Sequence, residues 1–347
     1  MTILIAAYNE EAVIGGKIEN TLALRYPAEK RQIIVVSDGS TDRTDEIVRG
    51  CAAAGVILHR VTQRGGKVPA LRSAERLVTG EVVLFSDADS TYDPQVLQKL
   101  VRHFSDPQVG AVSGHETRIA SASTGKGKGE GLYARLDNAV KRLEGQVGSQ
   151  VMVNGGFFAI RRDLLPFIPD HLTHDGIVPP ALYLQGYRTA YEPEATSIEV
   201  YALDSAADFR RRIRTVLQAA QSYLYVPAAL NPFRTGFYAI QIWSHRFLRW
   251  LVLPVLALIL AASLWLTPRS PFYLACTAAQ GLCYGLALCG WILDRRGQRP
   301  TFCYFPFYFL YIHTAAFAAV ILALSGRRIT TWRPTQRETK AGEATQG

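Results

Sequence analysis

The sequence predicts an α/β protein in which a Rossmann-like, mostly parallel sheet is followed by a transmembrane helical region. Over residues 1–230, short runs of β-branched residues alternate with helical patterns, an order typical of parallel sheets with helices on both faces. The runs are apolar without alternation, as expected of strands covered on both faces. Three apolar segments then follow, and each has the roughly 20 residues needed to cross a bilayer.

The predicted elements of the first part follow one another in a regular order. The strands are expected at Thr2–Ala6, Ile33–Ser37, Val56–Val61, Val82–Ser86 and Val109–Gly114. Helices are expected between them, at about 10–24, 42–54, 67–79 and 94–104. After a Gly-rich linker at 121–131 we expect a helix at 130–147, a strand at Phe157–Ile160, a helix at 175–186, a short strand pair at 188–201 and a basic helix at 207–224.

The apolar segments divide the chain into four parts. Residues 1–225 form the predicted catalytic domain, 226–246 an interfacial segment, 247–326 a transmembrane region and 327–347 a basic tail. The segments at about 247–266, 272–293 and 303–324 lack the polar face that a soluble amphipathic helix shows. Because a buried strand is predicted at the very start, the sequence leaves open whether a membrane helix precedes it.

The membrane topology has two readings. The loop at 294–300 carries three arginines and the loop at 267–271 carries one, so the positive-inside rule places the former on the cytoplasmic side with the catalytic domain. Three crossings would then put the tail on the opposite side, although the tail is also basic. Either one segment is not a full crossing or the rule is broken, and the sequence leaves both readings open.

Charge and cysteine content narrow the class of protein. The net charge of +9 is concentrated beside the apolar segments, which favours contact with membrane lipid and phosphate over nucleic acid. None of the five cysteines forms a C-x-x-C pair, and four lie in the apolar part. Zinc binding and a disulfide framework are therefore not expected.

Polar residues follow three of the predicted strands. Asp87 and Asp89 come directly after one strand, Asp38 after another, and Tyr8 and Glu10 after the first. Ligands bind beyond the carboxyl ends of strands in such sheets, and two carboxylates can hold Mg²⁺ or Mn²⁺, which keep substrate phosphates among their ligands. A D-x-D sequence alone is weak evidence, so their expected convergence matters more.

The segment Arg64-Gly65-Gly66-Lys67 has two interpretations. Its backbone amides and its lysine, at the start of a predicted helix, suit the binding of phosphate. The alternative is that Lys67 is a solvated surface charge.

These motifs together resemble a known family. The segments AAYNEE, VVSDGSTD, RGGK, FSDADS and GYRTAYEPEA, in this order, are similar to those of family 2 inverting glycosyltransferases with the GT-A fold. The resemblance covers roughly residues 1–225. The segments SHRFLRW and TWRPTQR also resemble the membrane-bound, exopolysaccharide-type members of that family.

The resemblance implies roles for the donor-side residues. Tyr8, Glu10 and Asp38 would hold the nucleoside, and Lys67 would approach the diphosphate. Asp87 would contact the ribose–diphosphate region and share the metal with Asp89. The implied cofactor is Mg²⁺ or Mn²⁺.

The resemblance also implies an acceptor side. Where the family carries an acidic pair, this chain has His174-Asp175, so Asp175 is assigned as the general base. A helix N-cap is the alternative role for Asp175. The departure at His174 leaves the acceptor site and the pH dependence in doubt, and Gly155 and Gly156 would either shape the acceptor site or form a close-packed turn.

The chain departs from the processive synthases of the family, which carry Q-x-x-R-W after the base. Here the corresponding segment is RRRIR, in which Arg211 and Arg214 could reach the diphosphate. Their alternative role is a solvated basic face near lipid. The missing motif weakens any expectation of long processive synthesis.

The expected protein is thus an integral membrane glycosyltransferase of a bacterial inner membrane, with a cytoplasmic catalytic domain. It would transfer sugar from a nucleotide-diphosphate donor, with a UDP-sugar favoured, to a glycan or lipid-linked acceptor, without any nucleic acid partner. One alternative is a polyprenyl-phosphate glycosyltransferase, and another is an inactive nucleotide-sugar-binding scaffold. A dinucleotide oxidoreductase is disfavoured because AAYNEE replaces a G-x-G-x-x-G turn.

Overall fold

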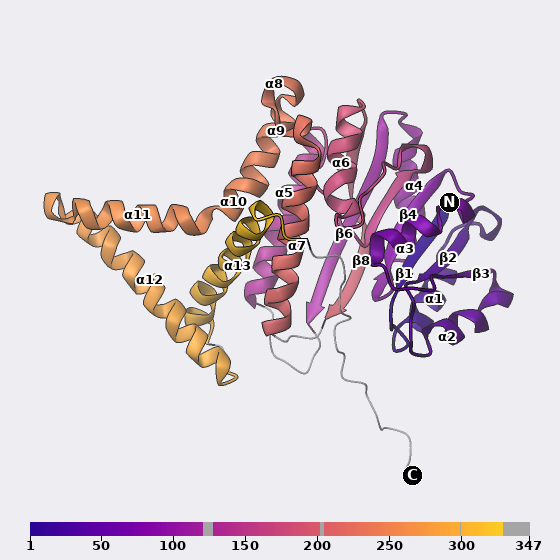
Figure 1. Cartoon of the computed structure of the whole chain (residues 1–347), viewed down its shortest axis with the longest axis horizontal. Helices are drawn as coiled ribbons and strands as arrows, with labels where there is room; N and C mark the ends of the chain where they lie inside the picture. The colour runs from indigo at the N-terminus through magenta and orange to yellow at the C-terminus, as the bar shows by residue number, and fades with distance from the viewer. Residues whose placement is uncertain (121–127, 202–204, 299, 329–347) are drawn as a thin grey trace, which may run out of the picture.

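A computed structural model describes residues 1–120, 128–201, 205–298 and 300–328 of the chain. Figure 1 shows a twisted sheet with helices on both faces and a helical arm that projects from one side of the molecule. The sheet has eight strands in the order β3-β2-β1-β4-β7-β6-β8-β5. The predicted α/β fold is confirmed, with a sheet that mixes parallel and antiparallel pairings, and it is followed by helices that are long and apolar enough to cross a membrane.

The first half of the sheet is parallel. It consists of β1 (Thr2–Ala7), β2 (Gln32–Ser37), β3 (Val56–Arg60) and β4 (Val82–Asp87), with β1 paired to both β2 and β4. These bounds match the predicted strands to within one residue. All four strands run in the same direction, so their carboxyl ends, and the polar residues that follow them, meet at one edge.

The second half of the sheet differs from the prediction. It is built from β7 (Phe157–Arg161), β6 (Val109–Ala120), β8 (Arg188–Tyr201) and the unpredicted β5 (Ser90–Tyr92). The expected strand pair at 188–201 is one long strand, which pairs in parallel with β6 across two register shifts. This pairing extends β6 beyond its predicted end at Gly114, because each strand supplies the other's backbone partners.

Two apolar clusters cover the two faces of the sheet. One joins the sheet to α1 (Ile14–Leu22), α2 (Thr44–Gly50) and α4 (Val96–Val101). The other joins it to α3 (Lys67–Ser73) and α6 (His174–Leu184). Helices α2, α3 and α4 are shorter than predicted and continue as 3₁₀ turns at Ala52–Ala54, Glu75–Leu77 and Arg102–Ser105.

The remaining helices include the three apolar segments. Long helices α5 (Lys128–Val147) and α7 (Ser205–Tyr225) precede the short helices α8 (Pro232–Thr235), α9 (Phe237–Ile242) and α10 (Leu248–Trp250), with a π-helical turn at Trp243–Phe247. Three apolar helices follow, α11 (Val252–Leu266), α12 (Pro271–Arg295) and α13 (Thr301–Leu324). Among the described residues, three helical segments are long and apolar enough to cross a membrane.

The three apolar helices are not placed alike. In Figure 1, α11 and α12 project away from the sheet, whereas α13 returns and lies beside α7. A third apolar cluster joins α7 and α13 with residues of α9 and α10. The apolar segments predicted from the sequence therefore face two different environments.

Candidate active site

The loops after β1 and β2 are joined by hydrogen bonds at the carboxyl edge of the sheet. Asn9 adopts a positive φ of 53°, which asparagine tolerates better than most residues, and its Oδ1 accepts from the Thr41 amide at 2.8 Å. The Glu10 amide donates to Oγ1 of Thr44 at 2.8 Å. These bonds hold Tyr8 and Glu10 beside the loop that carries Asp38.

Asp38 is buried, with 1% of its surface exposed. Its two oxygens accept from the amides of Gly65 and Gly66 at 2.8 and 2.9 Å, because a buried carboxylate needs donors. The prediction that these two amides bind phosphate is therefore corrected, since Asp38 already uses them. The Arg64 guanidinium lies 3.7 Å from the centre of the Tyr8 ring, so the same loop also reaches the loop after β1.

Lys67 joins Asp87 to the segment that contains Gly155. Its Nζ donates to Oδ1 of Asp87 and to the carbonyl of Gly155, the latter at 3.0 Å. Burial by itself would lower the pKa of Lys67, but Asp87 and the more distant charges of Asp175 and Asp89 raise it. Lys67 therefore stays charged at neutral pH and is not a solvated surface charge.

Gly155 and Gly156 lie between two of the predicted site residues. A Cβ built on Gly156 would overlap the carboxylate of Asp87, and one built on Gly155 would come within 3.3 Å of the Asp175 Cγ. The absence of side chains at both positions thus lets Asp87 and Asp175 approach the same short segment. Close packing of this turn, one of the two readings of the sequence, is what the geometry supports.

We predict that Gly156→Ala lowers kcat/KM by about 10²-fold, because the added methyl group displaces the Asp87 carboxylate and a shift of about 1 Å at a reacting centre has that effect. The matched control is Gly148→Ala, where an added Cβ meets nothing within 4 Å. Steady-state kinetics of both variants test this. Equal activity of the two would show that the Asp87 position is not critical.

Asp175 lies in the first turn of α6, and Thr173 is the N-cap residue. The N-cap interpretation of Asp175 is thus wrong, and its carboxyl group is available for another role. Burial raises the pKa of Asp175, although the Thr173 hydrogen bond and the Lys67 charge oppose that shift. A carboxylate with a raised pKa beside a glycine turn is a suitable general base.

His174 packs against aromatic residues of the core. The side chain is buried, with 7% exposed, and its ring lies 4.7 Å from that of Phe85 and 6.5 Å from that of Phe158. Burial, with the charges of Lys67 and Arg72, lowers its pKa to about 3. The acceptor-binding prediction for His174 does not fit this placement, because a neutral ring packed in the core offers little surface to an acceptor.

The sequence analysis missed Lys17, a buried lysine on α1. Its Nζ donates to the carbonyl and hydroxyl oxygens of Ser90 at 2.7 and 2.9 Å and lies 3.4 Å from the centre of the Tyr92 ring. Burial lowers its pKa to about 7, opposed by the charges of Asp87 and Asp89. Lys17 thus anchors the residues that directly follow the D-x-D turn, and a polar residue inside a helical apolar pattern was the only sequence signal for it.

The two predicted arginines of α7 have different surroundings. Arg211 pairs with Asp208 of its own helix at 2.7 Å. Burial lowers the pKa of Arg214, and the negative charge of Asp87 opposes this shift. The charges of Arg214 and Asp87 therefore influence each other, although Q-x-x-R-W is missing.

Asp87 and Asp89 are the residues that could hold a metal ion. In the part of the chain that the structure describes, three or more His, Cys, Asp or Glu residues do not gather into a metal-binding group. Mg²⁺ commonly binds through one or two carboxylates plus substrate phosphates, and does not need an all-protein cage. A turn with two carboxylates beside Lys67 fits an ion of that kind.

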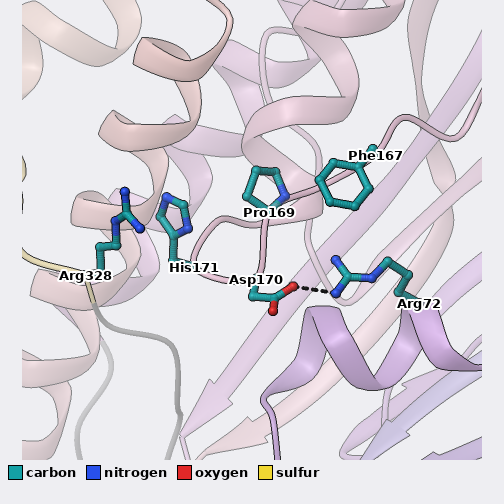
Figure 2. Close-up of a pocket in the computed structure, with 6 residues that line it drawn as sticks. All are labelled: Arg72, Phe167, Pro169, Asp170, His171 and Arg328. Atoms are coloured by element: carbon teal, nitrogen blue, oxygen red, sulfur yellow. Dashed lines mark hydrogen bonds and ion pairs between the residues drawn. The ribbon is translucent and has the colours of Figure 1, made fainter.

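One cavity lies apart from these carboxylates. It has a volume of about 460 Å³ and is lined by Arg72, Phe167, Pro169, Asp170, His171 and Arg328. Figure 2 shows Asp170 directed toward Arg72, with which it pairs at 2.6 Å. Because none of the predicted site residues lines this cavity, it is not the catalytic centre, and it marks a contact between the sheet domain and the end of α13.

Comparison with known proteins adds three findings. Residues 2–166 match the sequence profile of "Glycosyl transferase family 2". A poly-beta-1,6-N-acetyl-D-glucosamine synthase of Staphylococcus aureus is 32% identical over 202 residues, which are 56% of this chain and 48% of the relative. The corresponding synthase of Staphylococcus epidermidis is 28% identical over 207 residues, with the same coverage. The chain spans about half the length of the curated relatives it matches.

Among solved structures, a mannosyltransferase of Pyrobaculum calidifontis, determined with GDP-Man and Mn²⁺, is similar over 94% of this chain and 87% of its own. The TM-score is 0.64 and the sequence identity is 24%. At that identity the likeness shows a shared fold. Because the match covers 94% of this chain, it includes the apolar helices as well as the sheet.

Proposed function

We propose that this chain, whose residues 2–166 match the glycosyl transferase family 2 profile, is a membrane-anchored inverting glycosyltransferase with the GT-A fold. It transfers a sugar from a nucleotide-diphosphate donor to a glycan or lipid-linked acceptor in polysaccharide or cell-envelope synthesis. The observation that carries the proposal is the contact of the Lys67 ammonium with Asp87 and with the carbonyl of Gly155, a residue whose missing side chain lets Asp175 approach the same segment. Names of the curated relatives support the polysaccharide setting.

The donor occupies the carboxyl edge of the parallel strands in this proposal. Tyr8, Glu10 and Asp38 form the nucleoside side, where Asp38 also fixes the loop that carries Lys67. Lys67 and Arg214 face the diphosphate, and Arg211 supports the start of α7 through Asp208. A UDP-sugar is the favoured donor, because the staphylococcal relatives are named for a polymer of N-acetylglucosamine.

Asp87 and Asp89 are the proposed ligands of Mg²⁺ or Mn²⁺. When bound, such an ion neutralises charge on the leaving diphosphate. The Mn²⁺ named with the Pyrobaculum calidifontis mannosyltransferase agrees with a divalent cation but does not select between the two metals. The chain's own contribution is a pair of carboxylates on one short turn after β4.

The proposed chemistry is a single displacement. The acceptor hydroxyl attacks the anomeric carbon as Asp175 takes its proton, and the bond from that carbon to the diphosphate oxygen breaks on the opposite face of the sugar. The configuration is therefore inverted without a covalent enzyme intermediate. Lys67 stabilises the negative charge that develops on the leaving group.

The acceptor side is proposed to lie at Gly155, Gly156 and Asp175. Gly155 has no side chain to cover the Asp175 carboxyl group, and Gly156 has none to displace that of Asp87. His174 packs against Phe85 and Phe158 next to this segment. Its proposed role is structural and not contact with the acceptor.

The proposed location is a bacterial inner membrane, with the catalytic domain on the cytoplasmic side. Apolar helices at Val252–Arg269 and Pro271–Arg295 have the length and composition of membrane spans. Arginines concentrate at residues 295–296 and 327–328, which suits a surface of anionic lipid.

A donor screen tests the proposed function. We expect purified full-length protein in detergent to release nucleotide from one of the UDP-, GDP- or dTDP-sugars only with Mn²⁺ or Mg²⁺, and chelation by EDTA to stop the release reversibly. Binding of a donor without release would instead indicate the inactive scaffold. Product analysis separates the remaining classes, since a labelled lipid extractable into organic solvent indicates a polyprenyl-phosphate acceptor and an aqueous oligosaccharide indicates a glycan.

A further inference from the structure

Helix α13 is partly covered by protein, unlike the other two apolar helices. In its most apolar stretch 33% of the residues are buried, against 6% in the corresponding stretches of α11 and α12. Ala316 and Ala319 of α13 share an apolar cluster with Leu217 and Tyr223 of α7. One face of α13 is therefore occupied by a helix of the catalytic domain and cannot face lipid.

The middle of α13 contacts charged parts of the chain. Tyr308 accepts a hydrogen bond from Nη2 of Arg212 at 2.7 Å, and Arg212 also pairs with Asp208 at 2.6 Å. His313 lies 3.1 Å from the carbonyl oxygen of Arg249, whose guanidinium pairs with Asp137 at 3.1 Å. If α13 crossed a bilayer, these ion pairs would lie near its centre, where charged side chains are strongly disfavoured.

The C-terminal end of α13 also lies against the catalytic domain. Nε2 of Gln221, near the end of α7, donates to the carbonyl of Arg327 at 2.7 Å. Figure 2 shows Arg328 beside His171, in the cavity that Arg72 closes on the other side. Both the middle and the end of α13 are thus held on the side of the membrane that carries the catalytic domain.

From these contacts we propose that only α11 and α12 cross the bilayer, as a hairpin, and that α13 is an interfacial helix clamped onto α7. The inference rests on the proposed membrane location and not on the chemistry of the site. It selects the first of the two topologies that the sequence leaves open, in which one apolar segment is not a crossing.

The hairpin also has interface anchors at both ends. The Arg269 guanidinium lies 4.6 Å from the centre of the Trp265 ring at the turn between α11 and α12, and Arg295 lies 4.0 Å from the Trp291 ring at the end of α12. Such residues gather at membrane–water boundaries. With two crossings, Arg295 and Arg328 are on the same side, as the positive-inside rule requires.

The face of α13 that α7 leaves uncovered has a lipid-binding composition. Its exposed apolar side chains are Phe302, Phe305, Phe309, Ile321 and Leu324. An interfacial helix turns its apolar face toward the acyl boundary and keeps the opposite face out of the lipid, and in α13 the opposite face is covered by α7. The occupant of this face is therefore the lipid surface on the catalytic side.

Labelling of single cysteines with a membrane-impermeant maleimide, in sealed vesicles of known orientation, tests the proposal. The background is the full chain with its five native cysteines changed to alanine, and the substitutions are Ala53→Cys, Pro268→Cys, Gln298→Cys and Ser325→Cys. We expect Ala53, Gln298 and Ser325 positions to label from one side and the Pro268 position from the other. Labelling of the Ser325 position together with the Pro268 position would establish three crossings and overturn the proposal.

Two further readouts keep the outcomes distinct. Labelling of the Pro268 position from the catalytic side would show that α11 and α12 do not cross the bilayer, and it would overturn the proposal. Nucleotide release measured on the same vesicles tests the proposed reaction separately. If the cysteine-free protein does not fold, a second experiment uses the native chain. In that experiment GFP or alkaline phosphatase is fused after Gly347. With the catalytic domain cytoplasmic, we expect fluorescence and no phosphatase activity, and the reverse pattern overturns the proposal.

Discussion

Asp175→Asn is expected to lower kcat by about 10³-fold, within the range that a general base contributes. The amide keeps the size of the side chain but cannot accept the proton of the acceptor hydroxyl. Because the Asp175 carboxyl group lies against Gly155 and not in the donor loops, we expect the KM for the donor to change little. Steady-state kinetics with the donor identified in the screen measure both quantities.

The control for this variant is Asp170→Asn. Asp170 pairs with Arg72 at the separate cavity, and 55% of its side chain is exposed, so its conversion to the amide should leave turnover near that of the unchanged protein. Equal activities of the two variants would remove Asp175 from the mechanism. Thermal unfolding of both proteins excludes loss of the fold as the cause.

The pH dependence of the activity is a second test of Asp175 as the general base. A base acts only when deprotonated, and burial raises the pKa of Asp175. Activity should therefore decline as pH falls through this raised value, above the ordinary aspartate pKa of about 3.9. The acid limb should be absent from the residual activity of Asp175→Asn, and an unchanged limb in that variant would assign it to another group.

Asp89→Ala is expected to abolish metal-dependent release of nucleotide, with a loss of about 10³-fold or more, comparable to removal of a major source of transition-state charge stabilisation. Asp89 is the second carboxylate of the D-x-D sequence and the residue that we assign first to the metal, so its loss should remove metal binding. Electron paramagnetic resonance of free Mn²⁺, titrated with protein and UDP, measures the binding independently of turnover.

Asp163→Ala is the matched control for this variant, because Asp163 is exposed on the 3₁₀ turn Arg162–Leu164. We expect it to bind Mn²⁺ and to turn over as the unchanged protein does. Retention of Mn²⁺ binding and of near-normal turnover by Asp89→Ala would refute the metal assignment. Loss of turnover with normal Mn²⁺ binding would move Asp89 from the metal to another part of the donor site.

The sequence predicted the parallel half of the fold and the edge at which the site forms. Buried strands with both faces covered are apolar without alternation, and β1, β2 and β4 ended within a residue of their predicted bounds. Parallel strands share a direction, so polar residues such as Asp38 and Asp87, each directly after or at the end of a strand, had to meet at one edge. Local pattern and strand direction are sufficient for that inference.

The roles of several side chains could not be predicted from the local sequence pattern. The Gly65 and Gly66 amides suited phosphate by their sequence, but Asp38, 27 and 28 positions away, takes them. Lys17 reaches Ser90 across 73 positions. Which donor meets which acceptor depends on how distant segments pack, and a linear pattern does not contain that information.

The three apolar helices also show which features the sequence determines and which depend on tertiary packing. Length and hydropathy identified α11, α12 and α13 correctly as long apolar helices, because both properties are sums over neighbouring residues. Only the tertiary structure distinguished them, by placing α13 against α7 while α11 and α12 project away. Hydropathy records how apolar a helix is, whereas the choice between lipid and protein as its neighbour is made by the side chains that pack against it.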